Sequence, residues 1–421
     1  MCNGDKMNSN LKMSRRVEYI CVFLMVYLSM DTLLFGTNEN PYANIILVCL
    51  TGVITIILFF RRWAKTGHIV NSKRSFQRLF VLIFVLILSH IKALLLNGQG
   101  VDIQYIYNYL VIVFVYELSR TISAKAFCEK YINIMTLIAI ASVLLFCVDS
   151  IGLMEKLPSL TITNASGFRY YHFGLSAMME HVQYQIIRAY GIFREPGVYS
   201  VYLCIASGLI LFFQKEVSFG KLGILSLAII LTFSTAGYIV LAAEVFLFMC
   251  LKTKSKRELY IKIFVTVIVI VFAVTAMDKI YGKVFGKLHV ENESLNSRLY
   301  SIISGVDFSL KAPLLGKGWE FVSSNFEATT RQNYGIANVA FTNTYLRMAA
   351  TYGWLYTAIM LKNIWCQIRS GLAYIRPHVP KALPICIFAI WLLMFSNEGM
   401  VLNPLLYIWM FEREVIGNDS L

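Results

Sequence analysis

Long apolar segments alternate with short polar ones along almost the whole chain. A helix that crosses a membrane needs about 20 mainly apolar residues, because the hydrocarbon core of a bilayer is about 30 Å thick. Twelve segments come close to this requirement, at residues 17–36, 43–60, 79–96, 101–118, 131–151, 197–213, 220–233, 235–251, 260–277, 341–362, 381–396 and 399–411. The pattern therefore predicts an all-α, polytopic membrane protein with about twelve transmembrane helices.

The apolar stretch over residues 220–251 decides between twelve spans and eleven. It holds 32 residues and is interrupted by Ser234-Thr235-Ala236-Gly237. A single span here would place the basic segment 252–262 on the outer side of the membrane, although lysine and arginine favour cytoplasmic loops. We therefore predict two short helices joined by an outer turn, with both chain termini in the cytoplasm.

The composition supports a membrane protein. Hydrophobic residues make up 57% of the chain and charged residues only 15%, and the mean hydropathy is +0.63. These values exclude an ordinary soluble domain of this length. The net charge of +14 comes from basic clusters such as 61–78 and 252–262, which lie in predicted cytoplasmic loops. The basicity therefore reflects membrane topology and indicates no nucleic-acid partner.

Neither a further domain nor a metal or cofactor site is predicted. The sequence shows no soluble appendage and no nucleotide-binding loop, so residues 1–421 are expected to form one membrane domain. All nine cysteines lie in predicted spans or cytoplasmic segments, and CxxC spacing is absent. Disulfides and a cysteine metal site are therefore not expected.

Two polar segments, 152–196 and 278–340, are too long to be simple connections. Both fall on the outer side in the twelve-helix topology, which makes them the first place to look for function. In the second loop an amphipathic helix is predicted over residues 294–311, with Ser294 as its N-cap and Pro313 beyond its end. Its apolar stripe consists of Leu295, Leu299, Ile302, Ile303, Val306 and Leu310. The stripe fits a helix that lies on the membrane surface or across the outer mouth of the bundle, or else packing into the core.

Charge is concentrated where the first outer loop meets the following span, in the run Arg188-Ala189-Tyr190-Gly191-Ile192-Phe193-Arg194-Glu195-Pro196-Gly197. Arginine offers a planar fork of donors that suits phosphate oxygens. Pro196 suits the first turn of a helix, and Gly191 lets the backbone approach a ligand. A helix N-terminus beside two arginines predicts a phosphate or pyrophosphate site. Alternatively, the arginines contact lipid headgroups and Glu195 pairs with one of them.

Two further polar patterns lie on the same predicted side of the membrane. Ser297-Arg298 is followed by Pro313-Leu314-Leu315-Gly316-Lys317-Gly318, in which Arg298 is a second candidate ligand for an anionic group. The alternative is an ordinary exposed charge followed by a turn. Phe341-Thr342-Asn343-Thr344-Tyr345-Leu346-Arg347 opens the tenth predicted span, where Asn343 and Tyr345 fit either a substrate site or a polar helix entry.

Two acidic residues in the apolar regions need separate explanations. Glu398 falls in the predicted outer turn before the last span, on the same side as Glu195, so the two carboxylates can serve one site. Glu244 lies inside the eighth predicted span, where an unpaired carboxylate is costly. A structural partner on a neighbouring helix is expected for Glu244.

The run from Arg188 to Pro196 resembles the Arg-x-x-Gly-x-x-x-Glu-Pro signature of the O-antigen polymerase (Wzy) and O-antigen ligase superfamily. Ser297-Arg298 and residues 313–318 are similar to that superfamily's Ser-Arg, amphipathic helix and Pro-x-x-Gly-x-Gly. Asn343 and Tyr345 match its His-Asn-x-Tyr-Leu pattern, in which Thr342 replaces the histidine. The resemblance covers about residues 185–410.

The resemblance implies a membrane-embedded glycosyltransferase of the GT-C type, in the cytoplasmic (inner) membrane of a bacterium. It implies an undecaprenyl-pyrophosphate-linked oligosaccharide as donor, used at the outer face of the membrane without a cofactor. The product is expected to be O-antigen, capsule or exopolysaccharide. A chain-length regulator and a flippase of the same pathway are the expected protein partners.

The site residues are expected to divide into two roles. Glu195 is predicted to be the general base that accepts the proton of the attacking sugar hydroxyl, and Glu398 competes with it for that role. Charge on the departing pyrophosphate is expected to be stabilised by the arginines. The predicted substrate-binding residues are Arg188, Gly191, Arg194, Pro196, Arg298, Gly316, Gly318, Asn343 and Tyr345.

Two alternatives to a repeat-unit polymerase stay open. An O-antigen ligase would pass the finished polymer to another acceptor, but the family's histidine is replaced by Thr342, which favours the polymerase. A polysaccharide transporter or flippase would also have many spans. Transporters carry charges near the bilayer midplane and repeat symmetry, whereas this chain gathers its charges at the outer interface.

Overall fold

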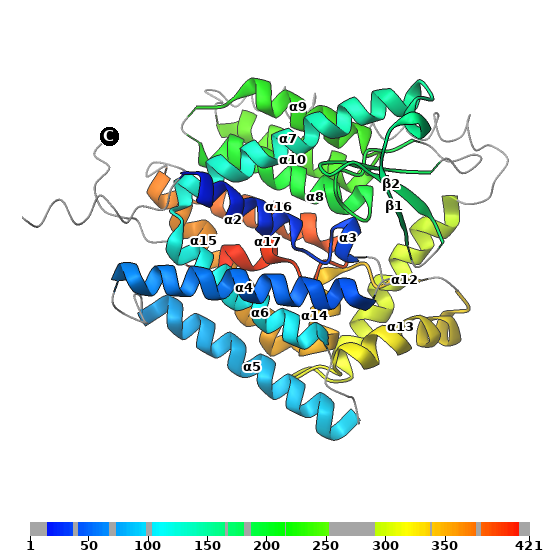
Figure 1. The fold of residues 1–421 in the computed structure, drawn as a ribbon. Coiled ribbons are helices and arrows are strands. Elements are labelled where there is room, and N and C mark those ends of the chain that lie inside the picture. Colours follow the sequence, from blue (N-terminus) through cyan, green and yellow to red (C-terminus); the bar gives the residue numbers. More distant parts are fainter. Residues whose placement is uncertain are drawn as a thin grey trace, which may run out of the picture.

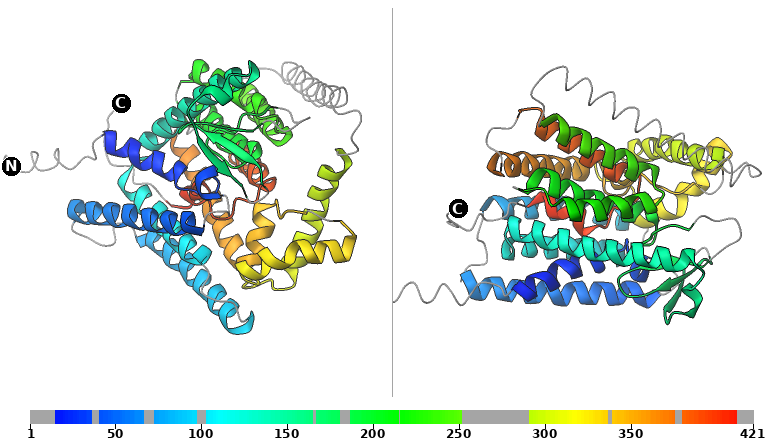
Figure 2. Two further views of the ribbon diagram at one scale, coloured as in Figure 1. Left: turned by 45° about the vertical axis from the view of Figure 1, so that its right-hand side comes forward. Right: turned by 90° about the horizontal axis from the view of Figure 1, so that it is seen from above.

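The computed structural model describes residues 15–36, 41–66, 73–97, 103–164, 167–180, 187–214, 216–251, 291–336, 339–375 and 380–411. This part of the chain is mostly helical, and its helices run alongside one another in a bundle (Figures 1 and 2). The first half contains α2 (Arg15–Tyr27), α3 (Leu33–Gly36), α4 (Pro41–Thr66), α5 (Lys73–Asn97), α6 (Ile103–Thr121) and α7 (Ala124–Ser150). The second half contains α8 (Pro196–Gly208) with its π-helical continuation η2 (Leu209–Phe213), α9 (Phe219–Leu231), α10 (Thr235–Leu251), α12 (Glu291–Leu310), α13 (Trp319–Tyr334), α14 (Thr344–Tyr352), α15 (Trp354–Ile375), α16 (Leu383–Ser396), α17 (Pro404–Tyr407) and η3 (Ile408–Met410).

A multi-pass membrane protein is confirmed by the length and apolar composition of the helices. Within the described residues, four helices are long and apolar enough to cross a bilayer: Tyr42–Ala64, Lys73–Leu95, Ala124–Ser150 and Pro196–Phe213. Three shorter apolar helices accompany them: Phe219–Leu231, Thr235–Leu251 and Leu383–Ser396. The predicted split of residues 220–251 into two helices is confirmed by α9 and α10. The predicted span at 260–277 lies outside the described residues, and the predicted total of twelve is not established.

The first predicted span, 17–36, is interrupted after Tyr27. The hydroxyl of Thr32 donates to the carbonyls of Tyr27 at 3.1 Å and Ser29 at 2.8 Å, and the Ser29 hydroxyl accepts from the Asp31 amide at 3.1 Å. Such local side-chain bonds compete with the helical backbone bonds. The chain therefore leaves the helix and carries Asp31 into the interior, where its side chain is buried.

The last predicted span, 399–411, contains only the short helices α17 and η3. At 1.5 Å per residue they extend over about 10 Å, which is too short for a bilayer. The preceding residues 397–403 are not helical, yet Met400, Val401 and Leu402 are buried. The irregular backbone of this segment is therefore covered by protein.

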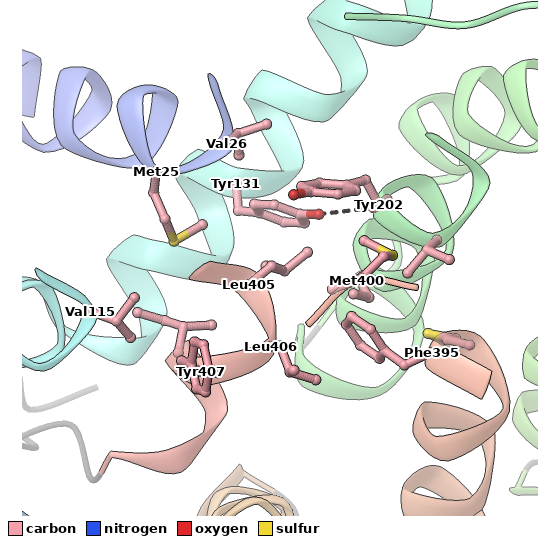
Figure 3. Close-up of a cluster of buried hydrophobic side chains, with 14 of the residues drawn as sticks. Met25, Val26, Val115, Tyr131, Tyr202, Phe395, Met400, Leu405, Leu406 and Tyr407 are labelled. Atoms are coloured by element: carbon pink, nitrogen blue, oxygen red, sulfur yellow. Dashed lines mark hydrogen bonds between the residues drawn. The ribbon is translucent and has the colours of Figure 1, made fainter. Parts of the chain in front are cut away.

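The residues after this loop form part of the central core (Figure 3). Leu405, Leu406 and Tyr407 are buried against side chains of α2, α6, α7, α8 and α16. The Tyr131 hydroxyl of α7 donates to the carbonyl of Tyr202 of α8 at 2.9 Å. The core therefore fixes the loop 397–403 relative to the start of α8.

The mostly helical structure agrees with the all-α prediction, and the segment 152–196, predicted to be the first outer loop, adds a small β-sheet that was not predicted. Strands β1 (Leu160–Thr163), β2 (Arg169–His172) and β3 (Ala177–Met179) form an antiparallel sheet in the order β1-β2-β3. The strands have only three or four residues each, so their alternation is too short to be recognised in the sequence. The sheet and the helices α12 and α13 lie at the same end of the bundle (Figures 1 and 2).

Helix α12 begins at Glu291, so Ser294 lies within it and is not its N-cap. Five residues of its predicted apolar stripe are exposed: Leu299, Ile302, Ile303, Val306 and Leu310. The opposite side buries Ser301, Ser304 and Phe308, and this side packs on α13 and α14. Packing of the stripe into the core is therefore wrong for these residues, and the membrane-surface alternative agrees with the exposed face.

The prediction of a structural partner for Glu244 is confirmed. Glu244 of α10 is buried, and its carboxylate accepts a hydrogen bond from the Ser207 hydroxyl of α8. The second carboxylate oxygen lies against Gly208, where a Cβ atom would approach it to 2.7 Å. This pair joins α8 to α10 within the bundle.

Candidate active site

Backbone hydrogen bonds hold the run from Arg188 to Glu195 between the sheet and the loop after α2. The Ala177 amide of β3 donates to the Gly191 carbonyl at 2.6 Å. From the other side, the Arg194 amide donates to the Asp31 carbonyl at 3.0 Å. The broken first span and the unpredicted sheet thus position the charged run from Arg188 to Glu195.

Gly191 and Pro196 shape the backbone of this run. Gly191 has a φ of +57°, and a Cβ atom there would come to 2.8 Å of the Tyr199 ring. The residue therefore allows the turn in which the Phe193 amide donates to the Tyr190 carbonyl at 3.1 Å. Pro196 begins α8, so the prediction that it stands at a helix start is confirmed.

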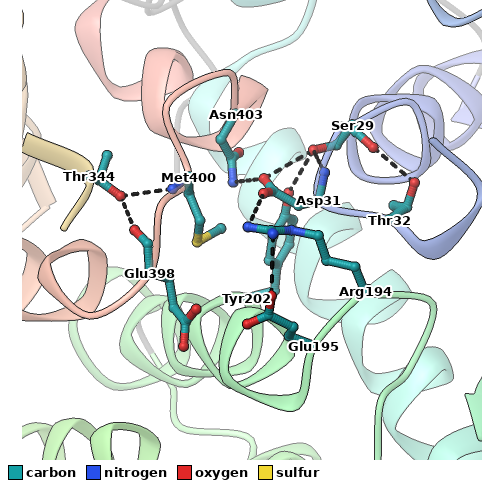
Figure 4. Close-up of polar contacts among 10 residues, drawn as sticks. All are labelled: Ser29, Asp31, Thr32, Arg194, Glu195, Tyr202, Thr344, Glu398, Met400 and Asn403. Carbon is teal, nitrogen blue, oxygen red and sulfur yellow. Dashed lines mark hydrogen bonds and ion pairs between the residues drawn. The ribbon is translucent and has the colours of Figure 1, made fainter. Parts of the chain in front are cut away.

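Arg194 occupies the centre of the site, between two carboxylates (Figure 4). Its Nη1 atom lies 3.3 Å from Oε1 of Glu195, and its Nη2 atom lies 3.9 Å from Oδ1 of Asp31. Burial alone would lower the pKa of Arg194, but the negative charges of Glu195 and Asp31 outweigh it and raise the pKa. The side chain is 26% exposed, so a permanent cation faces outward from a mostly buried position.

Asp31 anchors Arg194 from the buried side. Its Oδ2 atom accepts hydrogen bonds from the Ser29 hydroxyl at 3.2 Å and from Nδ2 of Asn403 at 2.7 Å. Burial raises the pKa of Asp31, and the charge of Arg194 opposes that rise. Sequence analysis missed Asp31, although an aspartate within an apolar segment is a signal of a buried polar role.

We expect Asn403→Ala to lower the free energy of unfolding by about 1–3 kcal/mol, because Asp31 would lose its shortest hydrogen bond in a buried position. The Asn403 side chain also accepts from the Leu405 amide at 2.6 Å and caps α17, so a further loss of about 0.5–2 kcal/mol is expected. Urea unfolding in detergent micelles measures the change. Asn397→Ala on the same loop is the control, since Asn397 is half-buried and donates to Leu393 of its own helix at 3.2 Å. Equal losses in the two variants would contradict the assignment.

Glu398 enters the site on the buried loop 397–403, and its side chain is 5% exposed. The hydroxyl of Thr344 donates to the Glu398 carbonyl and accepts from the Met400 amide at 2.9 Å, which fixes the loop. A Cβ atom at Gly197 would lie 1.9 Å from Oε1 of Glu398, so the carboxylate rests against the first turn of α8. Unpaired amides and the positive end of the helix dipole favour an anion there.

The environment of Glu398 suits proton transfer near neutral pH. Burial, and next the charge of Glu195, raise the pKa of Glu398 to about 8, while Arg298 and Arg194 act in the opposite direction. Within the described chain, no hydrogen bond is donated to its carboxylate. A carboxylate with such a pKa and no fixed donor is able to accept a proton from a substrate hydroxyl.

The structure brings three of the predicted residues into electrostatic range of Glu398: Arg194, Glu195 and Arg298. Arg298 projects from α12 and is exposed. Glu195 occupies the N-cap position of α8, but its side chain is turned to Arg194 and makes no capping bond. Arg188 is half-buried beside Tyr190, whose ring packs edge-on against Tyr170 at 5.5 Å.

Gly316 and Gly318 form a tight crossing over the junction of α14 and α15. Gly316 has a φ of +66°, and a Cβ atom there would lie 2.3 Å from the Thr351 carbonyl oxygen. The Gly318 amide donates to the same carbonyl at 3.0 Å, and Nζ of Lys92 donates to the Gly316 carbonyl at 2.6 Å. Backbone packing is thus sufficient to explain Gly316, and the φ of +88° at Gly318 explains the second glycine.

Oδ1 of Asn343 and the hydroxyl of Tyr345 form hydrogen bonds within the protein. Oδ1 of Asn343 caps α14 by accepting from the amides of Tyr345 at 3.1 Å and Leu346 at 3.0 Å. The Tyr345 hydroxyl donates to the Trp391 carbonyl at 3.4 Å. Thr342 bonds to Ser301 of α12 through its amide at 3.1 Å. Helix α14 also carries Arg347, to which sequence analysis gave no role. The Nη1 atom of Arg347 lies beside Gly399.

The arrangement combines cations that can hold a phosphate with carboxylates that can take up a proton. Arg194 and Arg298 lie on the exposed side of the cluster, and Glu398 and Asp31 on the buried side. Among the described residues, no group of three His, Cys, Asp or Glu side chains is placed to hold a metal ion. The chemistry that these residues offer is electrostatic stabilisation of an anion together with general base catalysis.

One family model matches the chain. Residues 222–361 match a family described as O-antigen ligase, which is about a third of the sequence and extends from α9 into α15. The match includes Arg298, residues 313–318 and the start of α14, whereas the run from Arg188 to Pro196 precedes it. No curated protein gave a match. The family supports a membrane enzyme of the ligase or polymerase type in general.

Proposed function

Because the match over residues 222–361 confirms the resemblance to the O-antigen polymerase and ligase superfamily, we propose that this protein polymerises polysaccharide repeat units. The donor is an oligosaccharide linked to undecaprenyl pyrophosphate, and the acceptor is a sugar hydroxyl at the outer face of the bacterial cytoplasmic membrane. The observation that carries the proposal is the position of Arg194 and Glu398 together at the start of α8.

The cations of the site would stabilise the leaving group. As the bond between the anomeric carbon and the pyrophosphate oxygen breaks, negative charge grows on the pyrophosphate. Arg194 is fixed in advance by Asp31 and Glu195, so it needs no rearrangement to meet this charge. Arg298 adds a second cation from α12, and its exposure allows it to approach the headgroup of a lipid-linked donor.

Glu398 is the better candidate for the general base. It is buried, and its pKa of about 8 lies close to neutral pH, so its ionised form, about a tenth of the molecules at pH 7, is a stronger base than an ordinary carboxylate. Glu195 is 54% exposed and pairs with Arg194 at 3.3 Å, which suits a residue that orients the arginine. In this mechanism, Glu398 accepts the hydroxyl proton, the sugar oxygen forms the new glycosidic bond, and undecaprenyl pyrophosphate departs.

An O-antigen ligase is the second candidate, because the matching family is described by that activity. The same cations and base would serve a ligase, since both reactions expel a polyprenyl pyrophosphate. The engagement of Thr342 with Ser301, in the place of the family histidine, favours the polymerase.

The purified protein, incubated with synthetic undecaprenyl-pyrophosphate repeat units, is expected to yield a ladder of products that differ by one unit. Gel electrophoresis of the released saccharides measures the ladder. A single transfer that occurs only when a lipid A-core acceptor is added would indicate the ligase. Movement of the intact donor across a vesicle membrane without any elongation would indicate a flippase and refute the proposal.

A further inference from the structure

Helix α14 extends a third arginine toward the site. The Arg347 amide donates to the Asn343 carbonyl at 2.9 Å, so the residue stands one turn after the capped start of the helix. A Cβ atom at Gly399 would lie 3.0 Å from Nη1 of Arg347. Gly399 follows Glu398 directly, and the guanidinium of Arg347 therefore lies beside the loop that carries the proposed base.

The guanidinium of Arg347 is held by an aromatic face. Its Cζ atom lies 4.8 Å from the ring centroid of Trp319, the first residue of α13. A cation–π contact fixes the plane of the guanidinium but leaves its N–H groups unused and its charge intact. Arg347 is thus oriented without being neutralised.

The charge of Arg347 has no counter-ion within the described residues. It is half-buried, and no described carboxylate is within ion-pair distance of it. The charge of Arg194 repels it across the site, and the buried Nε of Arg194 has no hydrogen-bond partner in the described structure. Two partly buried arginines within electrostatic range of each other are unfavourable unless an anion lies near both.

We propose that Arg347 binds the pyrophosphate of the lipid-linked donor together with Arg194 and Arg298. This inference rests on the proposed function. A pyrophosphate carries several negative charges over two phosphoryl groups, which matches three cations better than a single phosphate does. Each arginine fork can bind two oxygens of one phosphoryl group. The contribution of α14 to the site is therefore Arg347, while Thr342 and Asn343 connect and cap the helix.

Binding of inorganic pyrophosphate to the purified full-length protein tests this role without relying on polymerisation. We expect Arg347→Ala to weaken pyrophosphate binding by roughly 10–100-fold, as for loss of hydrogen bonds to a charged group. Arg347→Lys should recover only part of the affinity, because an ammonium lacks the planar fork. Trp319→Leu should weaken binding several-fold, whereas Trp319→Phe keeps an aromatic face and most of the affinity. Arg331→Gln on α13, an exposed arginine away from the cluster, is the control and should bind as the wild type.

Calorimetry of binding, with gel filtration of every variant, separates the outcomes. Unchanged affinity in both Arg347→Ala and Trp319→Leu, or no binding of pyrophosphate by the wild type, would overturn the inference. If the wild type binds pyrophosphate through Arg347 but makes no product ladder, the proposed polymerase fails and the anion site stands. A normal ladder with an unaffected Arg347→Ala variant would leave the polymerase intact and refute the role of Arg347.

Discussion

Replacement of Arg194 by alanine is expected to reduce chain extension by about 10²–10³-fold or more, the usual cost of removing one preorganised donor from a developing anion. Arg194 lies between Asp31 and Glu195 and faces the place where the pyrophosphate charge would grow. Arg194→Lys should rescue poorly, because lysine offers one compact charge in place of a planar fork. The rate of product formation from synthetic donor, at equal protein concentration, measures the effect.

A loss of folding must be separated from a loss of chemistry in this experiment. Arg194→Ala leaves the buried Asp31 carboxylate without its cation, which is destabilising. The double variant Arg194→Ala/Asp31→Asn removes that uncompensated charge and should recover stability while extension stays low. Recovery of extension in the double variant, or a normal ladder from Arg194→Ala, would show that Arg194 does not act on the leaving group.

Glu398→Gln is expected to slow extension by about 10²–10⁴-fold, the range for loss of a general base. Glutamine keeps the size of the side chain against Gly197, so the loop and the start of α8 should be preserved. Glu195→Gln should have the smaller effect, because Glu195 only orients Arg194 in the proposed mechanism. Initial rates of both variants at equal expression decide between the two carboxylates. A larger loss in Glu195→Gln would transfer the role of base to Glu195, and losses below about tenfold in both would exclude both residues.

The pH dependence of chain extension is a second test of Glu398 as the general base. A base must be ionised to act, and a group with a pKa of about 8 is about 1% ionised at pH 6 and half ionised at pH 8. Activity should therefore rise over this interval. Glu195 is one cause of the raised pKa of Glu398, so Glu195→Gln should move the rise to lower pH. A profile that is flat from pH 6 to 8 would contradict the assignment of Glu398.

The sequence by itself determined the class of protein and the position of most helices. Transfer into a bilayer depends on the apolar composition of about 20 consecutive residues, and this composition can be read from one segment of the sequence. The same locality explains why the break between α9 and α10 and the start of α8 at Pro196 could be predicted. The charged run from Arg188 to Pro196 was also evident, because it stands where a polar loop meets an apolar segment.

Local patterns failed where the structure depends on a partner. The exposed stripe of α12 could be recognised, but its direction could not, because periodicity identifies a face and does not say what covers it. Likewise, the sequence did not show that the backbone of Thr351 lies against Gly316, and the predicted substrate-binding role of Gly316 and Gly318 stays a prediction. The break after Tyr27 depends on hydrogen bonds of the Ser29 and Thr32 side chains, and the short sheet depends on pairing between strands of three or four residues. Neither feature is recorded in the pattern of apolar and polar positions.

Only the tertiary structure decided which side chains form the site. Asn403 and Asp31 are 372 positions apart in the sequence, yet Nδ2 of Asn403 lies 2.7 Å from Oδ2 of Asp31 in the fold. Arg347 became part of the cluster because α14 starts beside the loop of Glu398, and the lack of a side chain at Gly399 leaves room for the guanidinium. Burial of Glu398, which sets its pKa, likewise arises from packing of a non-helical loop against α8. Charge and hydropathy are properties of single residues, so the sequence identified the chemical groups. Distance and burial depend on the whole fold, so only the packing determined which of these groups act together.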